Sequence, residues 1–285
     1  MTTFHPELLA GKVAYVAGGT RGMNLAIAKA YANHGAAVAV ASRSPERCAA
    51  AQAELEEITG PGRALGLACD VRDYDALAAT FQQAAEQLGP LDLVVAGQAG
   101  NFYAPASDMS AKGFKTVIDI DLIGTFNVFR ASWEHLNRPG ASLVAITAPE
   151  AVRPLHFQAH VCAAKAGVNM LLKVLSLEWG PEGVRVNGIS PGPIEGSWGM
   201  SNVASPNPQL VEMIRRAVPM KRWGKESDIA DTALYLASDA ARWVTGVILE
   251  CDGGITIASP ETSRFDSVDD LRKDPRVQRP RPKKD

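Results

Sequence analysis

The sequence predicts one α/β domain built on a doubly wound parallel sheet. Short apolar runs rich in Val and Ala recur along the chain, and longer amphipathic segments separate them. Because the runs are almost continuously apolar, we expect strands that are buried on both faces of the sheet. The regular alternation of strand and helix implies right-handed crossovers. Ligands of such sheets bind beyond the carboxyl ends of the strands.

The apolar runs and the amphipathic segments predict seven strands and six helices in alternating order. The strands are expected at residues 13–17, 37–41, 64–69, 91–96, 142–147, 185–189 and 247–250. The helices are expected at residues 23–33, 45–59, 74–88, 111–136, 158–179 and 225–237. Residues 191–219, rich in Pro and Gly, are expected to be irregular. We interpret them as a substrate lid, because long loops in compact domains are usually functional or disordered.

Composition and charge exclude several function classes. The 285 residues carry a net charge of -2, which argues against nucleic acid as the main partner. Four scattered cysteines without CxxC spacing predict neither a disulfide framework nor a metal site. The chain has no run of 18 apolar residues and no apolar leader. We therefore expect no membrane span and a cytoplasmic location.

A glycine-rich loop follows the first predicted strand and reads Gly-Gly-Thr-Arg-Gly-Met-Asn over residues 18–24. Gly18 permits a tight turn, and Gly22 permits close approach of the backbone to a pyrophosphate. The start of the next helix supplies unpaired N–H groups and the positive end of the helix dipole. This position in a βαβ unit predicts a dinucleotide site, and we count Thr20 and Met23 among its residues.

The end of the second predicted strand favours NADPH over NADH. An NAD site usually has an acid there, whereas an NADP site has a nearby Arg for the 2′-phosphate. Here Ser42 and Arg43 end the strand, and Arg21 lies in the glycine loop. Either arginine could instead be a solvated surface charge. Asp70 and Val71 follow the third strand, where Asp70 could accept a hydrogen bond from adenine or cap the next helix.

The predicted dinucleotide-binding domain spans residues 1–258, and a C-terminal tail spans residues 259–285. Residues 272–285 of the tail contain seven Lys or Arg against two Asp, and three Pro interrupt them. Such a composition is typical of a solvated, disordered segment. The alternative is an arm that touches a neighbouring subunit or an anionic substrate.

Motifs along residues 8–258 together resemble those of the short-chain dehydrogenase/reductase family. They are the glycine loop, Cys-Asp-Val at 69–71, Ala-Gly at 99–100, Lys165 on a long helix, Arg-Val-Asn at 185–187, Pro-Gly-Pro-Ile at 191–194 and Asp-Gly-Gly at 252–254. The resemblance implies a seven-stranded Rossmann fold, usually tetrameric. It also implies that Lys165 holds the nicotinamide ribose. Pro191, Gly192 and Ile194 would line the nicotinamide.

The chain departs from this family at its usual catalytic groups. The family's Tyr, four residues before the Lys, is Val161; its Ser is Ala148; and the Asn of the preceding helix is Asp121. The third Gly of the loop is Asn24, and the Asn-Asn-Ala-Gly turn reads Gly-Gln-Ala-Gly over residues 97–100. Because valine and alanine transfer no proton, ordinary carbonyl reduction by this apparatus is not expected.

One subgroup of the family, the 2,4-dienoyl-CoA reductases, lacks the same groups, and several strings here resemble its peroxisomal type. They occur at residues 99–102, 114–117, 119–121, 124–128, 158–160, 178–181 and 191–194. The resemblance implies NADPH-dependent reduction of a conjugated acyl-CoA thioester, a step of fatty acid metabolism. Asp121 and Lys165 would form an acid pair that works through a bound water. The expected substrate-binding residues are Asn101, Phe102, Ala148, His160 and Trp198.

Other interpretations remain open. Asp121 and Lys165 could be only a buried pair that positions the ribose. Glu150 in an apolar pocket, or His160, could be the acid of a carbonyl or hydroxyl oxidoreductase with a bulky substrate. His160 could also be structural, and Glu150 could lie on an exposed turn. A third possibility is a non-catalytic NADP(H)-binding member of the family.

Overall fold

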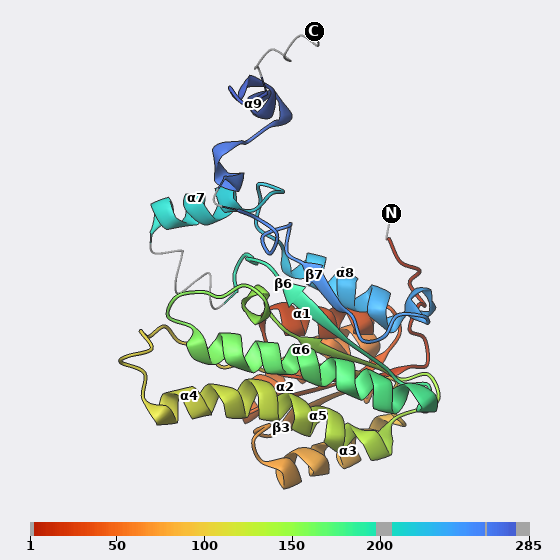
Figure 1. Ribbon diagram of the computed structural model, residues 1–285. Coiled ribbons are helices and arrows are strands. Elements are labelled where there is room, and N and C mark those ends of the chain that lie inside the picture. The colour runs from red at the N-terminus through yellow and green to blue at the C-terminus, as the bar shows by residue number, and fades with distance from the viewer. Residues whose placement is uncertain (1–2, 198–206, 260, 278–285) are drawn as a thin grey trace.

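The computed structural model describes residues 3–197, 207–259 and 261–277, and its centre is one parallel sheet (Figure 1). The seven strands lie in the order β3-β2-β1-β4-β5-β6-β7, and every neighbouring pair is parallel. This arrangement confirms the predicted α/β class. The strands are β1 Val13–Ala17, β2 Ala37–Ser42, β3 Ala64–Ala68, β4 Leu93–Ala96, β5 Ser142–Ile146, β6 Arg185–Pro191 and β7 Ile248–Cys251.

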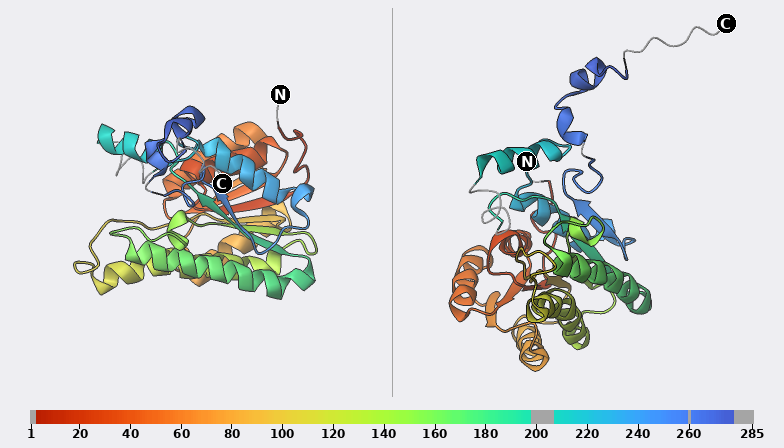
Figure 2. Two further views of the ribbon diagram at one scale, coloured as in Figure 1. Left: turned by 45° about the horizontal axis from the view of Figure 1, so that its top comes forward. Right: turned by 60° about the vertical axis from the view of Figure 1, so that its left-hand side comes forward.

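Helices cover both faces of the sheet (Figure 2). Along β1, Val13, Tyr15 and Ala17 point into one hydrophobic cluster, while Ala14 and Val16 point into the other. Strand pleating therefore explains why both sets must be apolar. The first cluster is closed by α3 Tyr74–Leu88, α5 Gly124–Ser132 and α6 Ala159–Trp179, and the second by α1 Gly22–Asn33, α2 Pro45–Thr59 and α8 Glu226–Ala237.

Strand register gathers several predicted site residues at one edge of the sheet. Ala17, at the end of β1, pairs with Ala41 of β2 and Ala96 of β4. The next residues continue this pairing: Gly18 N donates to Ala41 O at 2.7 Å, and Gly97 N donates to Ala17 O at 3.0 Å. The strand order also changes direction between β1 and β4. The glycine loop therefore lies at the topological switch point of the sheet.

The helix predicted over residues 111–136 is confirmed as one unbroken helical stretch over residues 111–135, but it is not α-helical throughout. It consists of α4 Ala111–Ile118, a π-helical turn η1 Asp119–Ile123, α5, and a 3₁₀ turn η2 Trp133–His135. At the start of α5, a Cβ on Gly124 would lie 2.7 Å from Val71 Cγ2. The backbone therefore packs against the loop after β3 at this junction. Single π-helical turns inside helices occur frequently at functional sites.

The segment 191–219, expected to be irregular, contains the helix α7 Pro208–Ala217. Asn207 caps this helix, because its Oδ1 accepts from Gln209 N at 3.0 Å and from Leu210 N at 3.3 Å. Proline at the first helical position supports the same start. The predicted substrate residue Trp198 lies outside the described residues.

The C-terminal segment contains local structure, most of it before residues 272–285, the part that was expected to be disordered. It contains a 3₁₀ turn η7 Thr262–Arg264 and the short helix α9 Val268–Lys273, and it leaves the body beside α7 (Figures 1 and 2). Asp266 ties it to the end of α7: its carboxylate lies 3.1 Å from Arg216 Nη2 and 3.5 Å from Lys221 Nζ. These ion pairs explain an attachment that composition alone did not indicate.

Within the described ranges, one helical stretch, Ala159–Glu182, is long and apolar enough to cross a membrane. In this fold it is chiefly α6, and one face of it packs on the sheet. Val168, Leu172 and Leu175 on that face belong to a core cluster. A core helix passes the same test of length and composition as a membrane span.

Candidate active site

The structure brings Asp121 and Lys165 together in a nearly closed environment. Lys165 Nζ lies 3.3 Å from Asp121 Oδ2, and the two side chains are 6% and 1% exposed. Lys165 also donates to Ile146 O at 2.9 Å, and Asp121 Oδ1 accepts from Gly100 N at 2.7 Å. Each charged group is thus held by the backbone at the end of a different strand. Paired charges with further hydrogen bonds tolerate burial that single charges do not.

The π-helical turn η1 and the residues after it hold the backbone of Asp121. Thr125 Oγ1 donates to Asp121 O at 2.6 Å, and Gln98 Nε2 donates to Thr125 Oγ1 at 3.1 Å. These two polar residues were missed in the sequence. A Thr four residues after the acid was the available signal, because a helical Thr can bond back by one turn.

Around the pair, an apolar surface replaces the family's phenol. Val161 lies one helical turn before Lys165, is buried, and packs in a small cluster with Val117 and Ala164. Ala148, at the position of the family's Ser, is half-buried after β5. Neither side chain carries a proton to transfer, so proton transfer here depends on other groups.

His160 lies against Phe102 beside this apolar cluster. The two ring centroids are 4.2 Å apart, and His160 is completely buried. Neither ring nitrogen has a geometrically good hydrogen bond with a residue that the structure describes. Burial lowers the pKa of His160, although the Asp121 charge and the Phe102 backbone act in the opposite direction. The imidazole is therefore neutral at pH 7 and has open hydrogen-bonding positions.

Two loops run side by side at the carboxyl edge of the sheet, one after β4 and one after β5. Gln158 Nε2 donates to Asn101 Oδ1 at 3.3 Å, and Ala104 N donates to Phe157 O at 3.1 Å. Phe157 has a φ of 68°, which is unfavourable for a bulky side chain, and it is 53% exposed. Tyr103 is also exposed. The predicted substrate residues Asn101 and Phe102 thus belong to a rim, formed by these two loops, that also carries the exposed apolar side chains Tyr103 and Phe157.

Glu150 lies in a 3₁₀ turn, η3 Pro149–Ala151, and is half-buried. Burial raises the pKa of Tyr103, and the nearby Glu150 charge adds to the increase. Glu150 is therefore a neighbour of Tyr103 at the rim, and its expected role as an acid remains a prediction.

The glycine loop has the geometry that a pyrophosphate requires. Gly18 has a φ of 72°, and a Cβ there would lie 2.9 Å from Gln98 N. Helix α1 begins at Gly22, and its N-cap residue Arg21 provides no side-chain cap. Thr20 precedes it and Met23 follows in the first turn. The N–H groups of that turn can therefore bind an anion, so the residues present fit a dinucleotide.

Two arginines stand near the expected 2′-phosphate position. The side chains of Arg21 and Arg43 are both exposed, and neither forms a hydrogen bond or close ion pair with the described part of the chain, although the Arg43 charge acts on the nearby Asp70 carboxylate. Ser42 ends β2 directly before Arg43, and its Oγ is 3.3 Å from Cys48 Sγ. Both guanidinium groups are thus available to an anion.

Asp70 has a firmer partner than the sequence suggested. Arg72 Nη2 lies 2.6 Å from Asp70 Oδ2, and hydrogen bonds from Arg72 lower the pKa of the Asp70 carboxylate. The suggested helix cap is wrong, because Asp73 caps α3 by accepting from Ala76 N at 3.1 Å. Adenine would meet an Asp70 carboxylate that is already paired.

On the nicotinamide side, Pro191 ends β6 and Ile194 is buried. A Cβ on Gly192 would lie 2.6 Å from Asp252 Cα, so this glycine is required by the approach of a neighbouring loop. Asp252 fixes that loop by accepting from Gly254 N at 2.7 Å and from Thr256 N at 2.8 Å. This packing sets the position of the Pro191–Ile194 motif.

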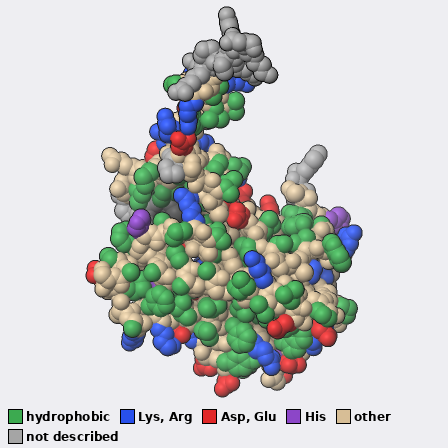
Figure 3. All heavy atoms as spheres, in the orientation of Figure 1, with side chains coloured by type: hydrophobic (Ala, Val, Ile, Leu, Met, Phe, Trp, Pro, Cys, Tyr) green, Lys and Arg blue, Asp and Glu red, His purple; other side chains and the backbone are tan. Residues whose placement is uncertain are grey.

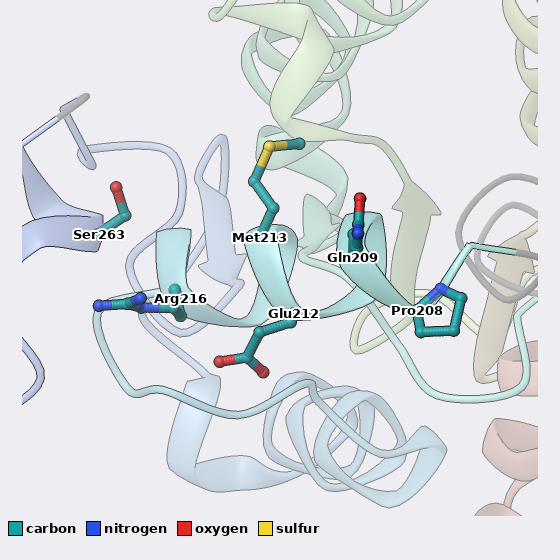
Figure 4. A pocket seen from close by; sticks show the side chains of 6 residues that line it. All are labelled: Pro208, Gln209, Glu212, Met213, Arg216 and Ser263. Atoms are coloured by element: carbon teal, nitrogen blue, oxygen red, sulfur yellow. The ribbon is translucent and has the colours of Figure 1, made fainter.

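A surface hollow of about 540 Å³ lies along α7, apart from the predicted cofactor-binding residues (Figure 4). Met213 and Arg216 line it together with Ser263 of the C-terminal segment. Met213 is largely exposed at this hollow.

Comparisons with known proteins agree with this geometry. A family profile described as Enoyl-(Acyl carrier protein) reductase matches residues 17–256. The peroxisomal 2,4-dienoyl-CoA reductase [(3E)-enoyl-CoA-producing] of Pongo abelii is 41% identical over 258 residues, which cover 90% of this chain and 88% of the relative. The peroxisomal 2,4-dienoyl-CoA reductase of Saccharomyces cerevisiae is 35% identical over 255 residues, covering 89% and 87%.

A crystal structure of a short chain dehydrogenase from Bacillus anthracis has the same fold. It matches with a TM-score of 0.77 and 33% identity, and the match covers 86% of this chain and 96% of that chain. The switch-point glycine loop, the buried Asp121–Lys165 pair and these relatives lead to one assignment. The chain is an oxidoreductase that belongs to the short-chain dehydrogenase/reductase family.

Proposed function

We propose that this protein uses NADPH to reduce a conjugated carbon–carbon double bond of an acyl-CoA thioester. The observation that carries the proposal is the buried Asp121–Lys165 pair in a site without the family's phenol. The names of the relatives, several of which are 2,4-dienoyl-CoA reductases, support the substrate class.

The chemistry of a conjugated thioester matches these groups. NADPH would supply the hydride, which adds to the far end of the conjugated system and moves the negative charge onto the thioester oxygen. Such a reaction needs an oxyanion stabiliser and a proton source near the thioester, not a phenol at a ketone. The Lys165 ammonium can stabilise the charge. Asp121 Oδ2, which lies 3.3 Å from Lys165 Nζ, can accept a hydrogen bond from a water, and that water would donate the proton to the carbon near the thioester.

The choice of NADPH rests on the exposed guanidinium groups of Arg21 and Arg43, neither of which is held by a hydrogen bond or close ion pair to a described residue. Replacing Arg43 by Ala should raise the NADPH dissociation constant about 10- to 100-fold and leave NADH binding unchanged, because hydrogen bonds to charged groups contribute about 1.5–3 kcal/mol. Arg47→Ala, an exposed arginine on α2, is the matched control. Titration of both cofactors measures the difference, and equal losses for NADPH and NADH would contradict this assignment.

His160 supports a second candidate function, the reduction of a carbonyl group on a bulky substrate. Its neutral ring and open nitrogens give it the chemistry of an acid–base group near Asp121. A carbonyl reductase of this kind would lose activity in His160→Phe or Glu150→Gln and keep it in Asp121→Asn.

We further propose a homotetramer and keep the prediction of a cytoplasmic location. Supporting assembly, α6 exposes Met170, Val174 and Leu177, and the neighbouring segment exposes Ile123 and Phe126. Figure 3 shows hydrophobic side chains over this face of the molecule. The named relatives are peroxisomal, so imaging of the tagged full chain tests the location directly.

A panel of acceptors tests the proposed activity. The full chain with NADPH should consume the cofactor with 2,4-dienoyl-CoA thioesters and not with simple ketones of similar size. Cofactor binding without turnover of any acceptor would favour a non-catalytic protein. Turnover of ketones alone would favour the carbonyl reductase.

A further inference from the structure

Two departures from the family's sequence pattern lie against each other in the dinucleotide cradle. The third glycine of the loop is Asn24, in the first turn of α1, and the first Asn of the turn after β4 is Gly97. Although 73 residues apart, they touch: Asn24 Nδ2 donates to Gly97 O at 2.6 Å. A longer contact joins Asn24 Nδ2 to Gly18 O at 3.4 Å.

The close contact between Asn24 and Gly97 limits which side chains the two positions can hold together. Gly97 is not in the left-handed region of φ, so its backbone conformation does not require glycine. However, a Cβ on Gly97 would lie 2.5 Å from Asn24 Cγ and 2.6 Å from Asn24 Nδ2. Distances this short are not tolerated in a packed interior. A side chain at 97 would therefore force the Asn24 amide out of its present position and break its hydrogen bond to Gly97 O.

The Asn24 amide also joins three segments that shape the cradle. It reaches Gly18 in the turn after β1 and Gly97 after β4, and it belongs itself to the turn of α1 that faces the phosphates. Gly18 in turn packs on the backbone of Gln98. Since both contacts end on carbonyl oxygens, the amide must present its NH₂ group to them.

We propose that Asn24 is a positioning residue for the dinucleotide: its amide holds the first turn of α1 against the turns that follow β1 and β4, and an amide at position 97 facing a glycine at position 24 would make the same connection from the other side. Compared with the family's usual sequence pattern, the Asn and the Gly of these two neighbouring segments have changed places: the Asn is at position 24 and the Gly is at position 97. The inference rests on the proposed dinucleotide site and concerns its geometry, not the substrate.

A double-mutant cycle on the full chain tests the exchange, with NADPH dissociation constants and melting temperatures as the two measurements. Asn24→Gly and Gly97→Asn should each weaken NADPH binding about tenfold, the first by removing the bridge and the second by the clash. The double variant N24G/G97N should bind within about threefold of the native chain, because contacting residues are strongly coupled. Additive losses in the double variant would overturn the proposal.

Further variants separate a bridge from simple filling of space. Asn24→Leu keeps the bulk and lacks the donor, so it should weaken NADPH binding as much as Asn24→Gly; native affinity in this variant would overturn the proposal. Asn33→Gly, at the exposed far end of the same helix, is the control. If Gly97→Asn does not fold, the double variant N24G/G97N is compared with Asn24→Gly alone, and NADPH binding by the double variant no tighter than by Asn24→Gly would overturn the proposal. The binding and melting measurements do not depend on catalytic turnover. They therefore test the role of Asn24 even if the protein does not reduce dienoyl-CoA thioesters.

Discussion

The Asp121 carboxylate is the residue on which the proposed chemistry depends most. Replacing it by Asn keeps the shape and the Gly100 contact region but removes the charge beside Lys165. We expect kcat with a dienoyl-CoA to fall about 10²- to 10³-fold, since a positioned acid–base group contributes at this scale. The NADPH dissociation constant should hardly change. Steady-state kinetics and a cofactor titration measure both quantities.

Asp119→Asn is the matched control for this variant. Asp119 starts the same π-helical turn, but it pairs with an exposed Lys115 at 2.6 Å on the outside of the molecule. Its loss should leave kcat within about twofold, because exposed pairs contribute little. Equal effects of the two substitutions would indicate damage to the turn, not loss of a proton-transfer group.

His160 makes the stability of the fold depend on pH in a defined window. Burial depresses the pKa of His160 in the folded chain below its ordinary value of 6.5. As the pH falls below 6.5, the unfolded chain binds this proton first, so the free energy of unfolding decreases until the pH passes the folded pKa. His160→Phe should remove this part of the dependence. Denaturant titrations between pH 7 and about 5 compare the two proteins, and parallel curves would refute the assignment.

At the scale of elements, the junction between η1 and α5 sets the position of Asp121. A Cβ on Gly124 would approach Val71 Cγ2 to 2.7 Å. Gly124→Ala should therefore destabilise the fold by about 1–3 kcal/mol through overpacking and also lower kcat. Adding Val71→Ala should restore much of both. Thermal melting and kinetics of the single and double variants test this, and an unrecovered double variant would show that another contact controls the turn.

The strands and the phosphate loop were predictable from the sequence because their causes are local. Residues 13–17 read as a strand since both faces of β1 are buried, and Gly18 was identified because a tight turn needs it. The π-helical turn η1 between α4 and α5 was not predictable from the local sequence. Gly124, which follows this turn, packs closely against Val71, a residue that is distant along the chain.

In the candidate site, too, the residues themselves could be predicted from the sequence, whereas their contacts with distant residues could not. Asp121 and Lys165 could be named from spacing and resemblance, but the backbone partners Gly100 and Ile146 come from neighbouring strand ends. Asp70 was expected to bind adenine, and its ion pair with Arg72, two residues away, was not predicted. The helix α7 was missed because the Pro and Gly content of the preceding segment concealed the Asn207 cap.

For the whole molecule, the exposed apolar face of α6 predicts assembly. Leu177 is 79% exposed and Met170 is 60% exposed, an arrangement that favours contact with a second copy. Light scattering should give four times the 30.3 kDa chain mass. Leu177→Glu should yield smaller species, and Val277→Glu, an exposed apolar residue on the C-terminal arm, serves as the control. A native protein that is monomeric at micromolar concentration would contradict the proposed tetramer.

The destination of the hydride tests the central claim most directly. With NADPH that carries deuterium at its transferable position, the product from a 2,4-dienoyl-CoA should contain one deuterium on the carbon at the far end of the former diene. Mass spectrometry and NMR of the isolated acyl group locate it. Deuterium at that carbon is the result that the Asp121–Lys165 site predicts. Deuterium only on the carbinol carbon of a reduced ketone, with no labelled acyl chain, would contradict it.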